Sequence, residues 1–266
     1  MSRRGSAALR EGMIFRGVLV GFDGSPASER ALTAARALRA ENGSLVALTV
    51  AETYYAAHAG MDAIAWDEKI RIEADEVRMA CADLLHGQPE CNAELATGHA
   101  PASILRTAKR LGSDLICIGA HGHGRMSGIL LGSAATRIVH DARCSVLIAR
   151  GFGPLVDFPA SIVVGVDDSP ASTAAAHVAS ALGRYAGASV RQLDRRPVYG
   201  LIDASRSADL LVVGSRGLHG LPGVRSVAER VAHEAACPVL IVRDAATRAA
   251  GEVASRGRSS VGARQG

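Results

Sequence analysis

A glycine-rich loop carries the residues best suited to chemistry in this sequence. Residues 119–133 read GAHGHGRMSGILLGS and follow a short apolar run that is typical of a buried strand. Glycine admits a positive φ and lets backbone N–H groups approach an anion closely. Gly132 and Ser133 then begin a predicted helix, whose first N–H groups and dipole favour a phosphate. The alternative is a flexible connector in which Ser133 only caps the helix.

A carboxylate accompanies this loop. Asp23 follows the first apolar run of the chain, in VLVGFDGSPAS. Parallel strands end at the same edge of a sheet, so Asp23 and the loop are expected to lie together there. The carboxylate could accept a hydrogen bond from a sugar hydroxyl or an adenine amine. Its alternative role is local, through Asx-type bonds that orient the next turn.

Several other kinds of site are excluded. A Walker A loop needs a lysine after its last glycine, but the chain has only Lys69 and Lys109, and neither is there. The first strand is not followed by Gly-x-Gly-x-x-Gly, and no Gly-x-Ser-x-Gly elbow occurs. His121 and His123 flank one glycine without a nearby carboxylate or cysteine cluster, so we predict no metal site. No motif supplies a nucleophile or a general base, so we expect that the protein is not an enzyme.

The chain also contains a damaged internal repeat. VLVGFDGSPAS recurs as IVVGVDDSPAS, which places Asp167 144 residues after Asp23. The offset is 95 residues for DLICIGAHG and DLLVVGSRG, and 93 residues for the final helix and strand. The second copy therefore lacks 49 residues from its middle and two more from its loop. We predict a complete domain over 13–152 and a truncated one over 158–243.

Apolar runs and helix signals alternate along both copies. Strands are predicted at 18–22, 44–50, 91–96, 114–118 and 145–149, with helices at 25–40, 64–86, 102–111 and 133–141. The second copy keeps strands at 160–166, 209–213 and 238–242, a fused strand within 189–196, and helices at 171–185, 198–206 and 226–235. This alternation predicts an α/β fold with parallel sheets and right-handed crossovers. The second half should be a four-stranded remnant, with its uncovered surface covered by the first half or by another chain.

Composition and charge restrict the partners. Of the 266 residues, 48% are hydrophobic and only 3% aromatic, which suits a buried parallel sheet but not base stacking on aromatic rings. The net charge of +4 comes from the segments 1–12 and 244–266, while the remainder is neutral. A nucleic-acid groove would put that excess on a folded face, so we expect no nucleic-acid partner. Both end segments are predicted to be disordered, solubilising tails; contact between a tail and an anion is the alternative.

The remaining signals concern cysteines, histidines and targeting. The five cysteines include no C-x-x-C pair, so neither a zinc nor a redox site is predicted, and Cys117 should be a buried apolar residue. His140 and His233 occupy equivalent helix positions and are expected at the surface. No signal peptide and no run of about 18 apolar residues are found, so we expect a cytoplasmic protein without a membrane span.

These motifs together make the chain resemble the universal stress protein family, as a tandem two-domain member. The resemblance rests on VLVGFDGSPAS, on TGHAPASIL at 97–105, and on DLICIGAHG with its Gly-x2-Gly-x9-Gly-Ser continuation, and it covers 16–150 fully and 160–243 in part. It implies Rossmann-like open sheets with strand order 3-2-1-4-5 in the first half and a truncated order in the second. It also implies binding of ATP, with Mg²⁺ as a possible companion, dimeric packing through the last strand, and pairing of the two halves.

The resemblance also implies site residues. Asp23 matches the acidic residue near ribose and adenine, and Val50 the residue whose backbone meets adenine. The full expected nucleotide site is Gly21, Phe22, Asp23, Val50, Ile118, Gly119, His121, Gly122, Gly132, Ser133, Ala134 and Ala135. Ala135 departs from the hydroxyl residue often found there, which should weaken binding by about 0.5–1.5 kcal/mol. In the second half Arg225 replaces the counterpart of Gly132, so no ordinary ATP site is expected there.

Three functions follow from this reading. The first is an ATP-binding regulatory protein of the stress response with one site, in the first half. The second is an interaction or scaffold module of the same fold that binds no nucleotide. The third is a slow ATPase or phosphotransferase, for which His121 is the only candidate helper near the phosphates.

Overall fold

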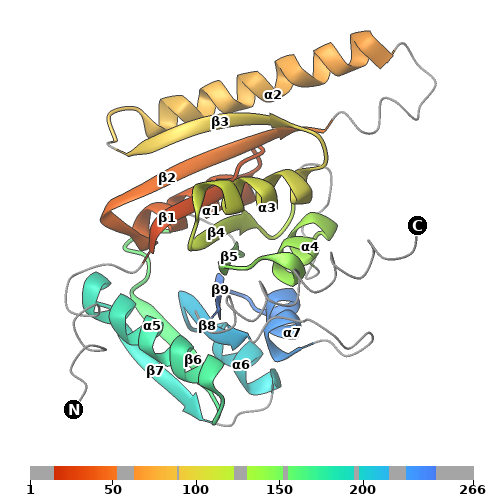
Figure 1. Cartoon of the computed structure of the whole chain (residues 1–266). Coiled ribbons are helices and arrows are strands. Elements are labelled where there is room, and N and C mark those ends of the chain that lie inside the picture. Colours follow the sequence, from red (N-terminus) through yellow and green to blue (C-terminus); the bar gives the residue numbers. More distant parts are fainter. Residues whose placement is uncertain are drawn as a thin grey trace, which may run out of the picture.

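The computed structural model describes residues 15–52, 63–88, 90–122, 131–151, 155–194, 198–215 and 226–243. The predicted tails at 1–12 and 244–266 lie outside the described residues, as do His123 and Arg225. We refer to residues 15–151 as the first half and to residues 155–243 as the second half. Figure 1 shows both halves arranged around one sheet.

The predicted alternation of strands and helices is confirmed in both halves. The first half contains β1 (Phe15–Gly21), α1 (Pro26–Leu38), β2 (Arg39–Ala51), α2 (Ala63–Leu85), β3 (Cys91–Thr97), α3 (Ala100–Leu111), β4 (Leu115–Gly119), α4 (Ser133–Asp141) and β5 (Ser145–Ala149). The second half contains β6 (Ser161–Val166), α5 (Pro170–Ala186), β7 (Ser189–Asp194), α6 (Val198–Ala204), β8 (Leu210–Ser215), α7 (Val227–Glu234) and β9 (Val239–Arg243). The largest difference is β2, predicted only from residue 44.

The early start of β2 has a local cause. Helix α1 ends at Leu38 because Arg39 has extended backbone angles, with φ −69° and ψ 135°. Arg39 pairs directly with Phe15 of β1, and the register then shifts before Gly17 pairs with Ser44. Residues 39–43, which were not part of the predicted strand, therefore belong to β2, and the strand follows α1 directly.

The two halves share one sheet, which corrects the expectation of two separate sheets. The strand order is β3-β2-β1-β4-β5-β9-β8-β6-β7, so the first half has the expected order 3-2-1-4-5. The halves join where β5 pairs antiparallel with β9, with Leu147 opposite Leu240. Every residue of both strands is buried. Pairing these two apolar edge strands removes both from water, which is the physical reason for a continuous sheet.

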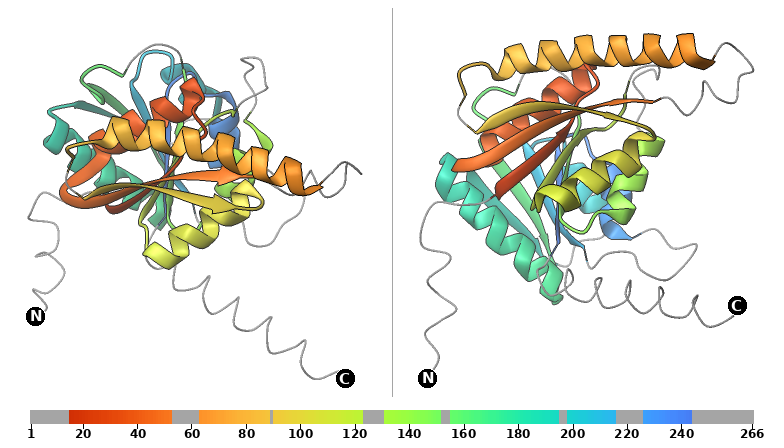
Figure 2. Two further views of the ribbon diagram at one scale, coloured as in Figure 1. Left: turned by 90° about the horizontal axis from the view of Figure 1, so that it is seen from above. Right: turned by 45° about the horizontal axis from the view of Figure 1, so that its top comes forward.

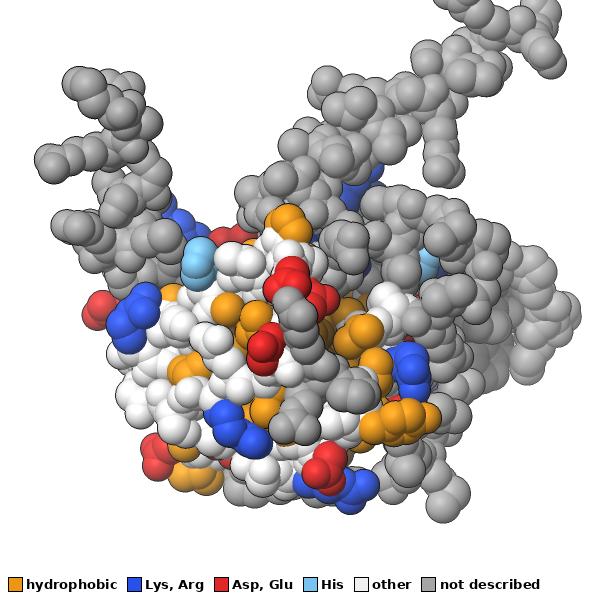
Figure 3. Space-filling view, turned by 90° about the horizontal axis from the view of Figure 1, so that it is seen from below, with side chains coloured by type: hydrophobic (Ala, Val, Ile, Leu, Met, Phe, Trp, Pro, Cys, Tyr) orange, Lys and Arg blue, Asp and Glu red, His pale blue; other side chains and the backbone are white. Residues whose placement is uncertain are grey.

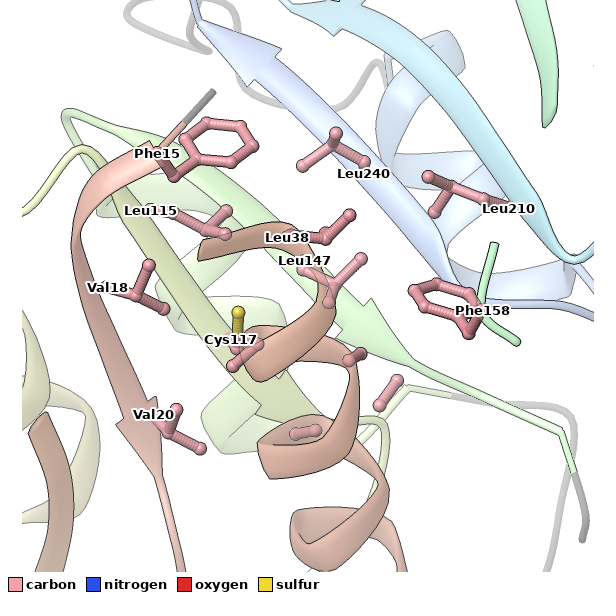
Figure 4. Close-up of a cluster of buried hydrophobic side chains, with 14 of the residues drawn as sticks. Phe15, Val18, Val20, Leu38, Leu115, Cys117, Leu147, Phe158, Leu210 and Leu240 are labelled. Atoms are coloured by element: carbon pink, nitrogen blue, oxygen red, sulfur yellow. The ribbon is translucent and has the colours of Figure 1, made fainter. Parts of the chain in front are cut away.

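Helices cover both faces of the sheet (Figures 1 and 2). Side chains of α1, α2 and α5 belong to the buried cluster on one face, and those of α3, α4, α6 and α7 to the cluster on the other. Figure 4 shows that the first cluster is continuous across the join, since Leu115 and Leu147 of the first half lie in one group with Leu210 and Leu240 of the second. Cys117 is fully buried in this cluster, as predicted.

The second half is the expected four-stranded remnant, but the first half does not cover its free edge. Strand β7 lies at the opposite end of the sheet from β3, and five of its six residues are exposed. Figure 3 views the molecule from below, the side where β7 lies in Figure 1, and shows apolar side chains in small groups between polar ones. The loss of the middle segment therefore leaves an edge strand uncovered by the described part of the first half.

None of the helices in the described ranges combines the length and the apolar character that crossing a membrane requires.

Candidate functional site

A cavity of about 450 Å³ opens at the carboxyl ends of β1, β2 and β4. All twelve residues of the expected nucleotide site line it: Gly21, Phe22, Asp23, Val50, Ile118, Gly119, His121, Gly122, Gly132, Ser133, Ala134 and Ala135. The structure thus gathers residues from three strands and from the start of α4 around one space. The location at the carboxyl edge of parallel strands is where open α/β sheets bind ligands.

Asp23 is held by the turn that precedes α1. Its Oδ1 accepts hydrogen bonds from the Ser25 N–H at 3.0 Å and from the Ser25 hydroxyl at 2.5 Å. Ser25 in turn caps α1 by accepting from the Ser28 N–H at 3.2 Å. The local Asx-type role of Asp23 is therefore present, and the same bonds fix its carboxylate at the cavity wall.

Gly122 is a glycine because Asp23 lies against it. A Cβ on Gly122 would lie 2.6 Å from Asp23 Oδ2, closer than real side chains come. A similar constraint holds deeper in the site, where a Cβ on Gly119 would lie 2.8 Å from Ala27 Cβ in the first turn of α1. The glycines of the loop therefore let α1, Asp23 and the chain after β4 approach closely around the cavity.

The first turn of α4 faces this cavity without a side-chain cap. Gly132 is the N-cap, with φ −64° and ψ 157°, and no side chain accepts from the helix start. The Gly132 N–H donates to Ala120 O at 2.8 Å, so it serves the loop itself. The next three residues, Ser133 to Ala135, line the cavity, and N–H groups at these positions have no partner within the helix. Such a helix start attracts an anion.

Backbone groups have to supply most of that attraction. The lining residues that the structure describes include no lysine or arginine, and their charged side chains are Asp23 and Glu52. His121, which is half-buried, is the only histidine among these lining residues. Within the described ranges no group of three or more His, Cys, Asp or Glu residues could hold a metal ion. The site can therefore bind an anionic group through amides, a hydroxyl and the helix dipole.

The second half differs at the equivalent helix start. The hydroxyl of Ser226, the counterpart of Ser133, accepts from the Glu229 N–H at 3.1 Å and caps α7. Glu229 also places a carboxylate in the first turn of α7, whereas the first turn of α4 has no acidic residue. The start of α7 is thus already occupied by its own hydroxyl and carries a negative charge, which opposes binding of an anion.

Sequence reasoning missed several lining residues. Besides the twelve, the cavity is lined by Ser28, Leu48, Glu52, Ala100, Ile104, Ala120 and Ile138. Glu52 is the informative one, since its Oε1 accepts from the Ala100 N–H at 2.8 Å and so caps α3. Leu48, Val50 and Glu52 alternate along and just beyond β2, and this period of two is the signal that could have found them.

His233 corrects the expectation of a surface histidine. It is 5% exposed, and its Nδ1 accepts from the Leu131 N–H of the first half at 3.3 Å. Its counterpart His140 is exposed, as expected, and lies beside Asp141. The two positions are equivalent in sequence, but only His233 lies where the halves meet.

Comparison with known proteins agrees with this architecture. The model of the Universal stress protein family matches residues 15–150 and again residues 194–243. The chain belongs to the universal stress protein family. In this universal stress protein the second match begins at Asp194, the last residue of β7, and so leaves out β6 and α5.

Individual relatives match the chain over different lengths. This universal stress protein is 31% identical over 137 residues to "Universal stress protein in QAH/OAS sulfhydrylase 3'region" of Thermus aquaticus, which covers 52% of the chain and 100% of the relative. It is 28% identical over 220 residues to universal stress protein Rv2623 of Mycobacterium tuberculosis, which covers 62% of the chain and 73% of the relative. A solved universal stress protein structure from Archaeoglobus fulgidus shares the fold, with a TM-score of 0.69, 18% identity, and coverage of 87% and 97%.

Proposed function

We propose that this universal stress protein binds ATP in the cavity of its first half and acts as a regulatory protein of the stress response in the cytoplasm. The observation that carries the proposal is the uncapped start of α4, which lines the same cavity as Asp23 and Val50. The phosphates would lie against Ser133 to Ala135, and the ribose near Asp23. The adenine would lie against the apolar wall that contains Val50 and Ile104.

The residues of the cavity suit a nucleotide better than a small anion. Leu48, Ile104 and Ile138 add apolar surface to the lining, which also contains the anion-attracting start of α4. An adenine ring with a phosphate chain has both characters. Because no acidic cluster forms a metal cage among the described residues, Mg²⁺ would arrive with the phosphates rather than through a dedicated protein site.

We propose one ATP per chain. Ser226 caps α7 with its own hydroxyl and Glu229 adds a negative charge to the first turn, so the start of α7 is a poor place for a phosphate. Since β5 and β9 pair with each other, a homodimer would have to use a surface other than these last strands.

The test compares the two equivalent serines in the full chain. Titration of ATP with magnesium by calorimetry should give one site, and Ser133→Ala should weaken it without lowering the melting temperature. Ser226→Ala should lower stability by about 1 kcal/mol through loss of a helix cap and leave ATP affinity unchanged. Gly132→Val should abolish binding while the protein stays folded, since the φ of Gly132 suits any residue; the added Cβ would lie 3.3 Å from Ala120 O, so a small loss of stability is expected as well. Binding that survives Gly132→Val would contradict the site.

An interaction module that needs no nucleotide is the second candidate. Ala135 contributes no hydroxyl to the phosphate end, and β7 leaves a strand edge exposed. Absence of ATP in protein purified without added nucleotide, followed by no uptake of added ATP, would favour this function. We propose that the protein is not an enzyme. An assay of ATP hydrolysis, with His121→Ala as the control, tests this.

A further inference from the structure

Helix α4 is held from the second half at both of its ends. Before its start, the Leu131 N–H donates to His233 Nδ1 on α7 at 3.3 Å. At its end, the Arg243 guanidinium of β9 donates to Val139 O. Figure 1 shows α4 and α7 on the same side of the sheet, on either side of the join between the halves. The helix that lines the cavity is therefore attached to elements that do not line it.

The contact between Leu131 and His233 lies away from water. Both residues are 5% exposed. An imidazole nitrogen accepts a hydrogen bond only when it carries no proton, so His233 acts here through an unprotonated Nδ1. A buried backbone N–H that loses its acceptor costs much more than a hydrogen bond on the surface. His233 therefore fixes the direction of the peptide that precedes the N-cap of α4.

The next amide is fixed from the first half. The Gly132 N–H donates to Ala120 O at 2.8 Å, directly after the Leu131 N–H that His233 receives. Two consecutive peptides are thus held, one by each half. These two fixed peptides set the direction of the N–H groups that follow, from Ser133 onward. Ser133, Ala134 and Ala135 are the residues of α4 that line the cavity at the helix start.

We propose that His233 is a positioning residue for the phosphate end of the nucleotide site, so that the second half, which has no ordinary site of its own, sets the affinity of the first. The inference rests on the proposed function. It assigns the truncated half a task beyond covering the edge of β5: it supplies the acceptor that keeps the start of α4 in place. The role is specific to His233, since the equivalent His140 of the first half is exposed and lies beside Asp141.

The test uses four full-length proteins: wild type, His233→Leu, His233→Asn and His140→Leu. Leucine removes the acceptor and keeps an apolar side chain, whereas asparagine places an oxygen at the topological position of Nδ1. His140→Leu is the matched control at the equivalent, exposed position. Far-UV circular dichroism and thermal unfolding verify that each variant is folded. The two readouts are amide hydrogen exchange of the peptide around 131–135 without nucleotide, and the Kd for ATP with magnesium.

We expect faster exchange around 131–135 in His233→Leu and about a tenfold higher Kd, the size of effect that a lost buried hydrogen bond produces. His233→Asn should restore both readouts at least in part, and His140→Leu should change neither. Unchanged exchange in His233→Leu, or faster exchange with an unchanged Kd, would overturn the inference. An equal effect of leucine and asparagine would also overturn it, because the acceptor would then be irrelevant. If the wild type binds no ATP, the proposed function fails, and the exchange comparison alone still decides whether His233 positions the start of α4.

Discussion

Arg150 and Arg243 are equivalent residues of the two copies, and each donates a hydrogen bond into the opposite half. The Arg150 guanidinium donates to Ala232 O near the end of α7, and the Arg243 guanidinium donates to Val139 O near the end of α4. Both side chains are buried, and burial lowers the pKa of both. The last carbonyls of a helix have no partner within the helix, and the helix dipole is negative at that end. Each arginine therefore makes a favourable hydrogen bond to the helix of the other half.

Removing either guanidinium should destabilise the join between the halves. Arg243→Met keeps most of the apolar stem but leaves Val139 O without its donor, so we expect the free energy of unfolding to fall by about 1–3 kcal/mol. Arg150→Met should have a similar effect through Ala232 O. Urea unfolding measures both. Arg206→Met is the control, since Arg206 is 75% exposed and should change stability by less than about 0.5 kcal/mol. Equal effects at all three positions would contradict a specific role of the exchanged arginines.

Two equivalent glycines should tolerate no side chain. A Cβ on Gly214 would lie 2.2 Å from Ala171 O, and one on Gly119 would lie 2.8 Å from Ala27 Cβ. We expect Gly214→Ala and Gly119→Ala to cost about 1–3 kcal/mol or more, because α5 and α1 would have to move from the sheet. Gly17→Ala is the control, since its Cβ would meet nothing closer than 3.4 Å. Thermal unfolding orders the three variants, and a stable Gly214→Ala would refute the close approach of α5.

A hydroxyl restored at Ala135 should strengthen ATP binding. Ala135 lines the cavity in the first turn of α4, so Ala135→Ser adds a donor at the phosphate end. We expect a gain of about 0.5–1.5 kcal/mol in binding free energy, read as a lower Kd by calorimetry. Ala228→Ser, the equivalent change in α7, should leave the Kd unchanged. A higher Kd for ATP in Ala135→Ser would indicate that the phosphates lie elsewhere.

Stability should fall in alkali because buried thiols resist ionisation. Burial raises the pKa of Cys81 to about 11 and that of Cys237 to about 12, and it raises the pKa of Cys117 well above its ordinary value. Unfolded thiols lose their protons from pH 9 upward while the folded ones keep them. The contribution of these protonated thiols to the free energy of unfolding is therefore fully present below pH 9 and is lost as the pH rises toward 11–12. For Cys237 the loss at pH 10 is about 1 kcal/mol.

The measurement compares urea midpoints at pH 7.5 and pH 10 for the wild type and Cys237→Ala. The variant starts from a lower stability, since a buried side chain is truncated, but it should lose less on going to pH 10. An identical pH-dependent loss in both proteins would show that Cys237 is not among the groups that resist ionisation.

Thiol reactivity should single out Cys91. Of the five cysteines, Cys81, Cys117, Cys144 and Cys237 are buried, and Cys91 is partly exposed on the edge strand β3. A thiol reagent attacks the thiolate, so burial and a raised pKa both slow the reaction. Ellman's reagent at pH 8 should therefore titrate one thiol quickly in the native protein and five in denaturant. Cys91→Ser should remove the fast phase, and a second fast thiol in the native protein would contradict the burial.

Much of the fold and of the candidate site could be predicted because its signals are local. Ser25 followed by Pro26 marks the start of α1, and Gly132 followed by Ser133 marks the start of α4, as the structure has them. Short apolar runs gave the strands. Since the carboxyl ends of parallel strands share an edge, Asp23 and the glycine loop were expected to meet, and the family resemblance added Val50; all of them line one cavity.

The sequence by itself therefore determined the alternation of elements, the repeat and its missing segment, and twelve of the residues around the cavity. Only the tertiary structure decided how the halves meet: β5 against β9 in one sheet, Arg150 and Arg243 exchanged, and Glu52 capping α3. It also separated His233 from His140, which have equivalent positions in sequence but opposite exposure. The physical reason is that caps and apolar periods act over a few residues, whereas a contact between residues about 100 positions apart, as between Leu131 and His233, leaves no mark on the local sequence.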